Sequence, residues 1–531
     1  MSVHAEVTAH LPEHVRALLA PDAYDHPAPA IELLQTHVSY VLLVGAHVYK
    51  LRKAIDLGFL DFTSLEQRKR DCLEEVRLNN RTCSTLYYGV VGISRDGPRY
   101  RLGGPGEIVD YAVHMRRLPA ARMLSALLSA GEVSREMIGR LVSKIVRFHA
   151  TAAGGRGVRE IGGYQTMVSN WAANLEEARP FVGRTITREH FEAVREYADA
   201  FLSTNKSLLL RREEEGRVRD GHGDLRADAI CFDSASPDGV CIFDCIEFSD
   251  RLRCGDTGLD IAFLAMDIER RGYVGISDVL LSLYTAACGD KTLPLVSSFF
   301  RSYRALIRGK VAGILLDQPG IAPDQRRAAL AESRLHFELA AAYARPNLTP
   351  RVVLVMGLTG SGKSLLAGAL AHRCGAALLS TDVVRKEMAG AAPGRRRPSA
   401  VGEGLYTPEM TGRVYQEMAS QAGAFLADGR AVILDGAYLT ADLRAVVAAL
   451  ARRRAVPLLV VECRAPDAVI RERQERRSAE PWTASDATWE VYLSQKARYE
   501  PPAEVPPAEL LRLATTFGLA REIEVVLEKL T

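Results

Sequence analysis

Residues 352 to 364 hold the pattern that most constrains the fold of this chain of 531 residues. Five apolar residues, 352–356, run directly into an octapeptide of the form G-x-x-x-x-G-K-S. Its residues are Gly357, Leu358, Thr359, Gly360, Ser361, Gly362, Lys363 and Ser364. Glycines let successive backbone N–H groups turn inward around phosphate oxygens, and the following helix presents its positive end to them. The pattern therefore predicts a phosphate-binding loop between a buried strand and a helix, and with it the binding of ATP or GTP.

Two side chains of this loop have specific predicted roles. Lys363 is expected to reach the β- and γ-phosphates and to act in catalysis through its charge, while the Ser364 hydroxyl is expected to bind Mg²⁺. A glycine-rich turn before an ordinary helix would need the same residues in register by chance. We therefore predict ATP and Mg²⁺ as cofactors.

Composition indicates the class of protein. Hydrophobic residues make up 47% of the chain and charged residues 25%, with a formal net charge of +3, which is typical of globular proteins. The length suggests about two to four domains. Because long nucleic-acid tracks require a basic stripe, this near-neutral balance argues against a nucleic-acid partner without excluding one.

The cysteines and the hydropathy of the chain indicate the cellular compartment in which the protein is expected. The nine cysteines are odd in number and show no CxxC pair, so neither a disulfide framework nor a zinc site is expected. The N-terminal residues lack the apolar core of a signal peptide, and no later stretch is apolar for long enough to span a bilayer. We expect a cytoplasmic protein that is neither exported nor inserted into a membrane.

A polar stretch with two prolines, residues 344–350, marks the clearest domain boundary. It divides the chain into predicted domains 1–345 and 346–531. In the second, apolar strand-like segments at 352–356, 377–379, 431–434 and 457–462 alternate with helical patterns from 363 and around 410–427 and 443–453. This alternation predicts an α/β domain with a parallel sheet covered on both faces.

The first domain has a different pattern. Residues 39–44 and 47–51 flank Gly45-Ala46 as a strand hairpin, and a charged helical pattern covers 64–81. Further strand-like segments follow at 86–93, 100–102 and 111–115, and a stripe of apolar residues at helical spacing runs from 138 to 148. A small sheet-rich lobe followed by a large helical one is predicted, which is an α+β domain.

Four residues of this domain suggest a second nucleotide site. Asp224 lies in His-Gly-Asp, which fits the start of a kinase catalytic loop H-x-D-x-x-x-x-N, where the Asp takes the acceptor proton. Asp244 follows a short strand and could bind a metal. Upstream, Lys50 ends the hairpin strand and Glu75 lies on the following helix, so Lys50 could hold phosphates and pair with Glu75. Taken singly, a lysine in a strand is usually a solvated edge residue, and a glutamate in a charged helix usually faces solvent.

Residues 37 to 320 resemble the aminoglycoside phosphotransferase-like family of small-molecule kinases, in particular the subgroup fused to a C-terminal P-loop kinase domain. The matching stretches are THVSYVLLVGAHVYKLRKAIDLGFLDF, YAVHMRRLPAARML, HGDLRADAICF and IFDCIEFSDRLRCGDTGLDIAFLAMDI, then GLTGSGKS, STDVVRK, VILDGAYL and ASDA. The resemblance implies a protein-kinase-like N-terminal fold and an ATP-binding bifunctional phosphotransferase. It does not identify a substrate.

One departure from the family pattern concerns metal binding. Family members generally contain HGDLHxxNI, whereas Ala229 replaces the Asn and Arg226 replaces the second His here. A methyl group cannot bind Mg²⁺, and the neighbouring Asp228 is displaced by one position on the loop. Asp244 would remain as a ligand for one metal. We therefore hypothesise that the N-terminal domain is a degenerate kinase, or a pseudokinase that still binds a ligand.

The predicted acceptor site lies in the second domain. By resemblance to polynucleotide 5′-kinases and P-loop small-molecule kinases, Asp382 would be the general base and Arg385 would contact the acceptor. Asp435 ends a predicted strand and would act near Mg²⁺, as a Walker B residue does. The alternatives are a helix N-cap for Asp382 and a turn-forming Asp-Gly for Asp435.

Arg473 and Arg477 lie four residues apart on a predicted helix and would share one face. In this kinase family such arginines come from a lid that closes over the phosphates and stabilises the transition state. A charged surface helix predicts the same residues. Ser485-Asp486-Ala487 then matches the segment of the family that follows the lid.

Together these observations predict an ATP-dependent phosphotransferase that acts on a hydroxyl of a small molecule, with its chemistry most clearly placed in the P-loop domain. One alternative is a nucleotide-binding regulatory protein with a pseudokinase sensor. Another is a kinase of nucleic-acid 5′ ends or of sugar nucleotides. The sequence predicts neither the acceptor's identity nor the oligomeric state.

Overall fold

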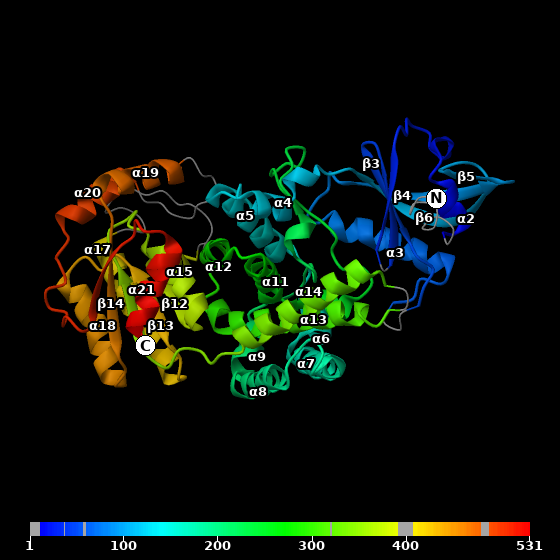
Figure 1. Ribbon diagram of the computed structural model, residues 1–531. Coiled ribbons are helices and arrows are strands. Elements are labelled where there is room, and N and C mark those ends of the chain that lie inside the picture. The colour runs from blue at the N-terminus through cyan, green and yellow to red at the C-terminus, as the bar shows by residue number, and fades with distance from the viewer. Residues whose placement is uncertain are drawn as a thin grey trace. The chain divides into compact units, whose positions relative to one another are not determined.

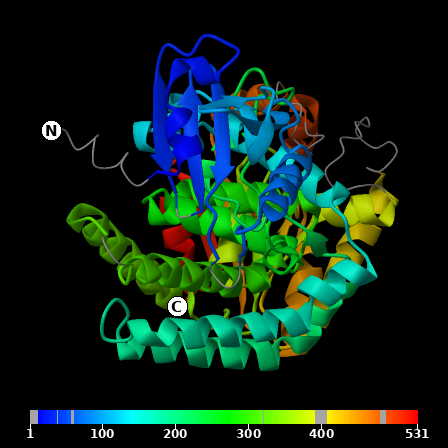
Figure 2. The same ribbon diagram turned by 90° about the vertical axis from the view of Figure 1, so that its right-hand side faces the viewer.

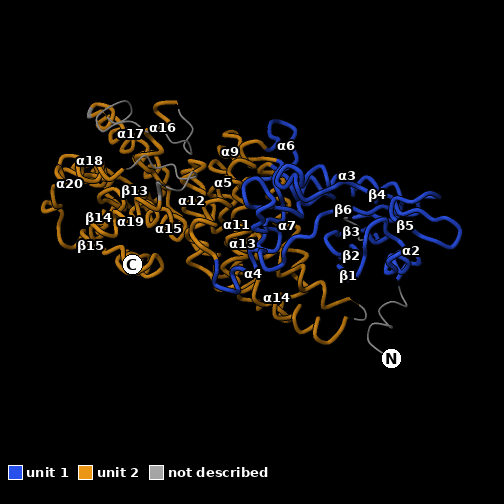
Figure 3. Tube along the Cα trace, turned by 90° about the horizontal axis from the view of Figure 1, so that it is seen from above, with its two compact units in different colours: residues 1–132, 152–162, 220–255 blue, residues 133–151, 163–219, 256–531 orange. Residues whose placement is uncertain are grey.

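The computed structural model describes residues 11–36, 38–56, 60–318, 321–390, 407–478 and 488–530 (Figure 1). The chain forms two compact units, coloured separately in Figure 3. The first unit comprises residues 1–132, 152–162 and 220–255, and the second comprises 133–151, 163–219 and 256–531. The second unit thus contains both a helical part, up to residue 345, and the whole P-loop part. The predicted boundary between 345 and 346 stays a prediction.

The first unit is built on a six-stranded antiparallel sheet with the strand order β1-β2-β3-β6-β4-β5. Its strands are β1 (Ile31–Gln35), β2 (Ser39–Val44), β3 (His47–Arg52), β4 (Tyr87–Asp96), β5 (Arg99–Leu102) and β6 (Glu107–Arg116). Gly45 turns the predicted β2–β3 hairpin with a φ of 58°. The predicted charged helix is α3 (Leu65–Asn79), which Ser64 starts with a capping box to Gln67.

The loops that complete the first unit carry short elements. They are α2 (Glu13–Ala17), α4 (Leu124–Ala130), α6 (Arg156–Gly162), β8 (Ile230–Cys231), β9 (Cys241–Ile242) and α10 (Asp250–Arg253). A disulfide joins Cys83, which follows α3, to Cys241 in β9. The expectation of no disulfide is therefore wrong. Two cysteines that are 158 residues apart in sequence leave no spacing signal, and only the pairing of distant segments brings them together.

The helical part of the second unit packs around long helices. Its elements are α5 (Arg135–Thr151), α7 (Tyr164–Ala178), α8 (Arg188–Thr204), α9 (Lys206–Glu214), α11 (Thr257–Arg270), α12 (Val274–Cys288), α13 (Leu293–Leu315) and α14 (Pro323–Tyr343). Helices α13 and α14 pack along each other (Figure 2). The apolar stripe predicted for α5 is buried, with Ile138, Leu141 and Ile145 almost fully excluded from solvent.

The P-loop part contains a five-stranded parallel sheet with the order β12-β13-β11-β14-β15. Its strands are β11 (Val352–Met356), β12 (Ala377–Ser380), β13 (Val432–Gly436), β14 (Leu458–Arg464) and β15 (Leu510–Ala514). The helices are α15 (Lys363–Cys374), α16 (Thr381–Met388), α17 (Pro408–Ala427), α18 (Ala441–Arg454), α19 (Asp467–Ser478), α20 (Trp489–Ala497) and α21 (Leu519–Leu530).

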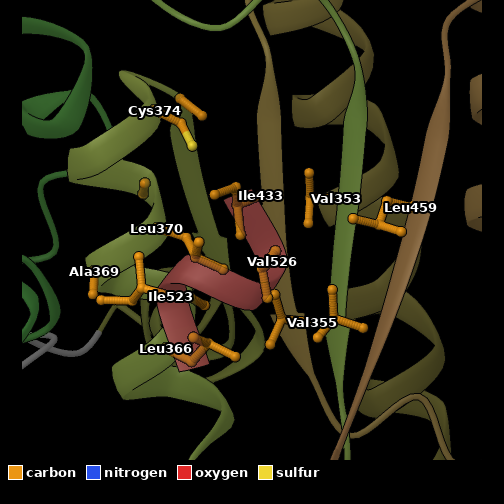
Figure 4. Close-up of a cluster of buried hydrophobic side chains, with 14 of the residues drawn as sticks. Val353, Val355, Leu366, Ala369, Leu370, Cys374, Ile433, Leu459, Ile523 and Val526 are labelled. Atoms are coloured by element: carbon orange, nitrogen blue, oxygen red, sulfur yellow. The ribbon is translucent and has the colours of Figure 1, made fainter. Parts of the chain in front are cut away.

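Helices α15 and α21 cover one face of this sheet. Leu366 and Leu370 of α15 meet Val526 of α21 over Val353 and Ile433 of the central strands (Figure 4). All five residues of β11 are buried, as expected for a strand covered on both faces. This packing fixes the end of β11, from which the phosphate loop starts.

The predicted fold class is confirmed. The N-terminal region is an α+β protein-kinase-like fold, and the C-terminal region is an α/β P-loop kinase fold with a parallel sheet. Among the described residues, no helix is both long enough and apolar enough to cross a membrane.

Candidate functional site

The phosphate loop leads from β11 into α15 as predicted from its glycines. Gly357, Gly360 and Gly362 have φ angles of 148°, 82° and 88°, which side chains of L-residues rarely allow. A Cβ atom at Gly357 would lie 2.5 Å from the carbonyl oxygen of Cys463, so the neighbouring strand also leaves no room for one. The loop backbone thus requires glycine at these positions.

A cavity of about 900 Å³ opens over this loop within the second unit. The predicted site residues that line it are Thr359, Gly360, Gly362, Lys363, Ser364, Asp382, Arg385, Asp435 and Arg473. Gly357, Leu358 and Ser361 belong to the loop but do not line the cavity. The structure therefore gathers the predicted base, acceptor contact and metal ligands of the P-loop domain around a single space.

Asp435 is a buried carboxylate at the end of β13. Burial raises its pKa, whereas the charge of Lys363 and a hydrogen bond from Ser364 act to lower it. Its Oδ1 atom has no hydrogen-bond partner among the described residues. A buried oxygen without a donor is costly unless a cation or water satisfies it, so Asp435 and Ser364 fit a Mg²⁺ site. The residue lies inside the strand, which does not support the alternative of a turn-forming Asp.

Asp382 lies in the first turn of α16, one residue beyond the helix start. The N-cap position belongs to Ser380, and no side chain forms a capping hydrogen bond there. The Asp382 side chain is exposed and lines the cavity, while Arg385, one turn later, lines it from a buried position. This geometry does not support the capping alternative and leaves the carboxylate facing the space above the phosphate loop.

Arg473 of α19 is tied to the phosphate loop. Its Nη1 donates to the carbonyl oxygen of Gly360 at 3.3 Å and to Oγ1 of Thr515 at 3.2 Å, and its Nη2 donates to the Thr515 carbonyl. Thr515 in turn donates to the carbonyl oxygen of Ser361 at 2.6 Å. Arg473 therefore braces the loop as well as bringing charge to it.

Two predicted features of the lid region lie outside what the structure describes. They are the side chain of Arg477, whose backbone is part of α19, and the segment Ser485-Asp486-Ala487. Sequence analysis missed two loop contacts: Thr515, and Gln495 of α20, whose Oε1 accepts from the Thr359 N–H at 2.8 Å. Thr515 directly follows a strand of the parallel sheet, and this position could have pointed to it. No sequence pattern pointed to Gln495.

In the first unit, the structure brings together Lys50, Glu75 and Asp244. Lys50 Nζ lies 3.0 Å from Glu75 Oε1 and 2.9 Å from Asp244 Oδ1. The Lys50 ammonium is the main reason why the pKa of Asp244 falls to about 2. Asp244 has a φ of 62°, a strained value that turns its side chain toward the end of β3.

Sequence analysis missed a buried charge cluster beside this lysine. Arg52 donates from Nη2 to Glu75 Oε2 at 2.6 Å and also pairs with Asp71 and Glu247. Glu75 is thus shared between Lys50 and Arg52, which fixes α3 against β3. A lone buried charge would be costly, and this cluster satisfies each group with a partner.

The predicted base Asp224 is engaged by its own loop. Arg226 binds both carboxylate oxygens, from Nε at 3.0 Å and from Nη2 at 2.7 Å. Ala229, at the position of the metal-binding Asn, is buried. The carboxylate of the predicted base is thus held by a guanidinium, and the position of the predicted metal ligand carries only a methyl group.

One family model and two solved structures match parts of the chain. Residues 352–502 match a family described as an AAA domain. A gluconokinase from Sinorhizobium meliloti is 19% identical with a TM-score of 0.25, covering 35% of this chain and 93% of that one. A choline/ethanolamine kinase family protein from Mesorhizobium loti is 13% identical with a TM-score of 0.37, covering 65% and 99%. With TM-scores this low, neither structure carries weight for the function.

A relative that matches over most of its length is more informative for the family. Uncharacterized protein Rv2004c of Mycobacterium tuberculosis is 31% identical over 476 residues, which cover 89% of this chain and 91% of the relative. The match therefore includes both the kinase-like region and the P-loop region. This chain belongs to the same family as that protein, with the fused aminoglycoside phosphotransferase-like and P-loop kinase architecture that its motifs indicate.

Proposed function

We propose that this protein is an ATP-dependent kinase that transfers the γ-phosphate to a hydroxyl group of a small molecule in the P-loop cavity. The observation that carries the proposal is the exposed Asp382 carboxylate, which lines the same cavity as Lys363 and the buried Asp435. A phosphate loop alone supports nucleotide binding. A carboxylate facing the same space adds a group that can accept the proton of a hydroxyl acceptor.

Each residue has a distinct part in this reaction. The N–H groups of the loop and the Lys363 ammonium hold the nucleotide phosphates and balance charge that develops on the γ-phosphoryl group. Asp382 accepts the proton as the acceptor oxygen attacks, and Arg385 orients the acceptor. Ser364 and Asp435 would hold Mg²⁺, which would supply further charge neutralisation between the phosphates.

The experiment is a comparison of Lys363→Ala with wild type and with Lys529→Ala, an exposed lysine of α21 outside the cavity. ADP release is measured against a panel of sugars, nucleosides, aminoglycosides and oligonucleotides with free 5′ ends. The proposal is supported if wild type and Lys529→Ala release ADP only when an acceptor is present and Lys363→Ala does not. If Lys363→Ala releases ADP as fast as wild type, the assignment of phosphate transfer to the P-loop domain is wrong.

A second candidate function concerns the first unit, and the contact between Arg226 and Asp224 favours it. With its base held by a guanidinium and with Ala229 at a metal position, this site would bind a nucleotide without transferring phosphate. The Lys50–Glu75 pair remains in place for that binding. The first unit would then act as a sensor for the P-loop kinase.

Two variants of the full chain test the second candidate. If the first unit has no transferase activity, Asp224→Asn leaves total turnover unchanged, while Ala229→Asn combined with Arg226→His raises it by restoring the family pattern. A large loss of turnover in Asp224→Asn would contradict the sensor role.

A further inference from the structure

We propose that Gln495 of α20 is a further nucleotide-binding residue of the P-loop site, and that its side-chain N–H groups donate to the γ-phosphate of bound ATP. The inference rests on the proposed function and adds to it a residue that distinguishes a nucleoside triphosphate from a diphosphate. Three features of α20 lead to it: the face that lines the cavity, the contact with the phosphate loop and the anchors of the helix.

One face of α20 lines the cavity. Its residues there are Val491, Ser494, Gln495 and, at the C-cap, Arg498, and their spacing is that of a single face of an α-helix. The three polar side chains of this face can all donate hydrogen bonds, and none is a carboxylate. Phosphate oxygens only accept hydrogen bonds, so a face made of donors complements them.

The carboxamide of Gln495 is fixed at one end by the phosphate loop. Its Oε1 accepts from the N–H of Thr359 at 2.8 Å. Thr359 is a buried residue of the loop that also lines the cavity. Because the backbone N–H can only donate, the amide oxygen and not the amide nitrogen must face it. The nitrogen is therefore turned away from this N–H.

The other end of the carboxamide is available to a ligand. Within the part of the chain that the structure describes, the Nε2 group of Gln495 has no hydrogen-bond partner. The side chain is only partly buried and lines the cavity. An amide nitrogen carries two N–H donors. Gln495 can thus hold the loop with its oxygen and donate to a ligand oxygen with its nitrogen at the same time.

The end of α20 lies on the side of the phosphate loop where transfer is expected. Just beyond the helix, Glu500 donates its N–H to the carbonyl oxygen of Leu439 at 2.8 Å, and its Oε2 accepts from the N–H of Ala441 at 2.8 Å. Leu439 and Ala441 follow β13, and the end of β13 carries Asp435. Since Asp435 fits a Mg²⁺ site and Mg²⁺ bridges the β- and γ-phosphates of a nucleotide, α20 reaches the γ-phosphate end of the site.

Further contacts fix the orientation of the helix around Gln495. The hydroxyl of Tyr492 donates to Asp467 Oδ1 at 2.7 Å, and Nζ of Lys496 donates to Asp467 Oδ2 at 2.5 Å. Tyr492 is almost fully buried, so its contact is shielded from solvent. Asp467 lies at the start of α19, which also carries Arg473. A donor held in this way needs little reorganisation when the ligand binds.

The two ends of the loop would then hold different phosphates. The N–H groups at the start of α15 and the Lys363 ammonium would hold the β-phosphate, at which ADP ends. Gln495 contacts Thr359, in the first half of the loop, and would donate to the γ-phosphate, which only ATP has. The contact should therefore strengthen the binding of a triphosphate and leave the binding of ADP nearly unchanged.

The test measures the affinities of the full-length chain for ADP and for the non-hydrolysable ATP analogue AMP-PNP, with Mg²⁺, by calorimetry. All proteins carry Lys50→Met, which removes the predicted phosphate contact of the first unit. Addition of Lys363→Ala to this reference protein should abolish most of the binding and so identifies the P-loop site. The titrations are run at about 0.15 M salt, which screens charges beyond about 8 Å.

Gln495→Glu is the decisive variant. It keeps an oxygen for the Thr359 N–H but replaces the amide donor with a carboxylate, which repels a phosphate. We expect it to bind AMP-PNP about tenfold or more weakly than the reference protein, the typical loss of one hydrogen bond to a charged group, and to bind ADP within about threefold. Leu493→Glu is the matched control, because it adds the same charge to the exposed face of α20 outside the cavity, and it should keep both affinities.

A residue that only ordered the loop would give a different result. Gln495→Glu would then bind both nucleotides like the reference protein, because Thr359 keeps its acceptor, while Gln495→Met would weaken ADP and AMP-PNP alike. Unchanged affinities in Gln495→Glu, or an equal loss for both nucleotides, would overturn the γ-phosphate contact. Absence of any binding that depends on Lys363 in the reference protein would instead count against the proposed function itself.

Discussion

Gly368 of α15 lies directly against Ser282 of α12, and its replacement by alanine tests whether α12 is docked on α15 as the structure shows. A Cβ atom at this position would lie 2.3 Å from Oγ of Ser282, 2.9 Å from its Cβ and 3.1 Å from its Cα. Rotation of the serine side chain relieves the first contact only, because the Cα belongs to the backbone of α12. The two helices therefore have to move apart to accept the methyl group.

The magnitude follows from two destabilising contributions and one stabilising contribution. Overpacking of a well-filled contact costs about 1–3 kcal/mol. Loss of the hydrogen bond from Ser282 Oγ to the Leu365 carbonyl, 2.9 Å in length, adds about 0.5–1.5 kcal/mol. Alanine stabilises a helix by up to about 1 kcal/mol relative to glycine, which acts in the other direction. We expect Gly368→Ala to lower the free energy of unfolding of the second unit by about 1–3 kcal/mol.

Urea unfolding of the full chain measures this change, and hydrogen exchange of peptides from α12 and α15 locates it. Gly275→Ala is the control, since Gly275 lies on α12 and a Cβ there would meet nothing within 4 Å. That variant should be as stable as wild type or slightly more stable. In the double variant Gly368→Ala with Ser282→Gly, the loss should be smaller than the sum of the two single losses. Wild-type stability and wild-type exchange in Gly368→Ala would refute the docking of α12 on α15.

Three further predictions concern the two sites and the disulfide. Asp382→Asn should keep ATP affinity and reduce transfer by roughly two to four orders of magnitude, because an amide cannot take the acceptor proton; unchanged turnover would exclude the general base. The double variant Cys83→Ser, Cys241→Ser lacks the disulfide, and urea unfolding should show that its first unit is less stable by about 2–4 kcal/mol, because a link over 158 residues restricts the unfolded chain. If the wild-type protein is equally stable with and without reductant, the disulfide is not formed. The pKa of Asp244 is about 2 in the folded protein and about 4 in the unfolded chain. Its pairing with Lys50 therefore stabilises the fold fully above about pH 4, and this contribution is lost as the pH falls toward about 2. The difference in stability between wild type and Lys50→Met should therefore narrow over that pH range, and a widening difference would contradict the pairing.

Local patterns predicted the strands of the two main sheets apart from β1 and β15, but none of the helices from α7 to α14 individually. The run of five apolar residues gave the bounds of β11, because a strand buried on both faces has no polar positions. The Gly45 turn likewise located the hairpin of β2 and β3. Strand β15, Leu510–Ala514, was not predicted, because only Leu513 of its residues is buried and the strand follows a proline-rich segment. Its place in the sheet depends on pairing with β14, which is a long-range property.

Within the P-loop site, sequence order was a good guide where residues lie at the ends of parallel strands. Asp435 was predicted in this way, whereas the role of Asp382 was predicted by resemblance to P-loop kinases, and both residues line the cavity. Gln495 contacts the loop from a helix far along the chain, and Arg473 was expected to be part of a lid but binds the loop backbone itself. Such contacts depend on how helices pack, and neither spacing nor residue type reveals them.

The packing of the helical part of the second unit also bears on the proposal that the first site is degenerate. Arg226 and Ala229 lie on one loop, and together they occupy the predicted base and remove a metal ligand, so loss of transfer at this site needs no change in the fold. If a kinase-like region served only its own active site, such a loss would leave its helical part without a role. In this structure that part packs α12 against the phosphate-loop helix and lines the cavity beside Asp382. The helical part would then contribute to the structure of the P-loop cavity, whether or not the N-terminal region transfers phosphate.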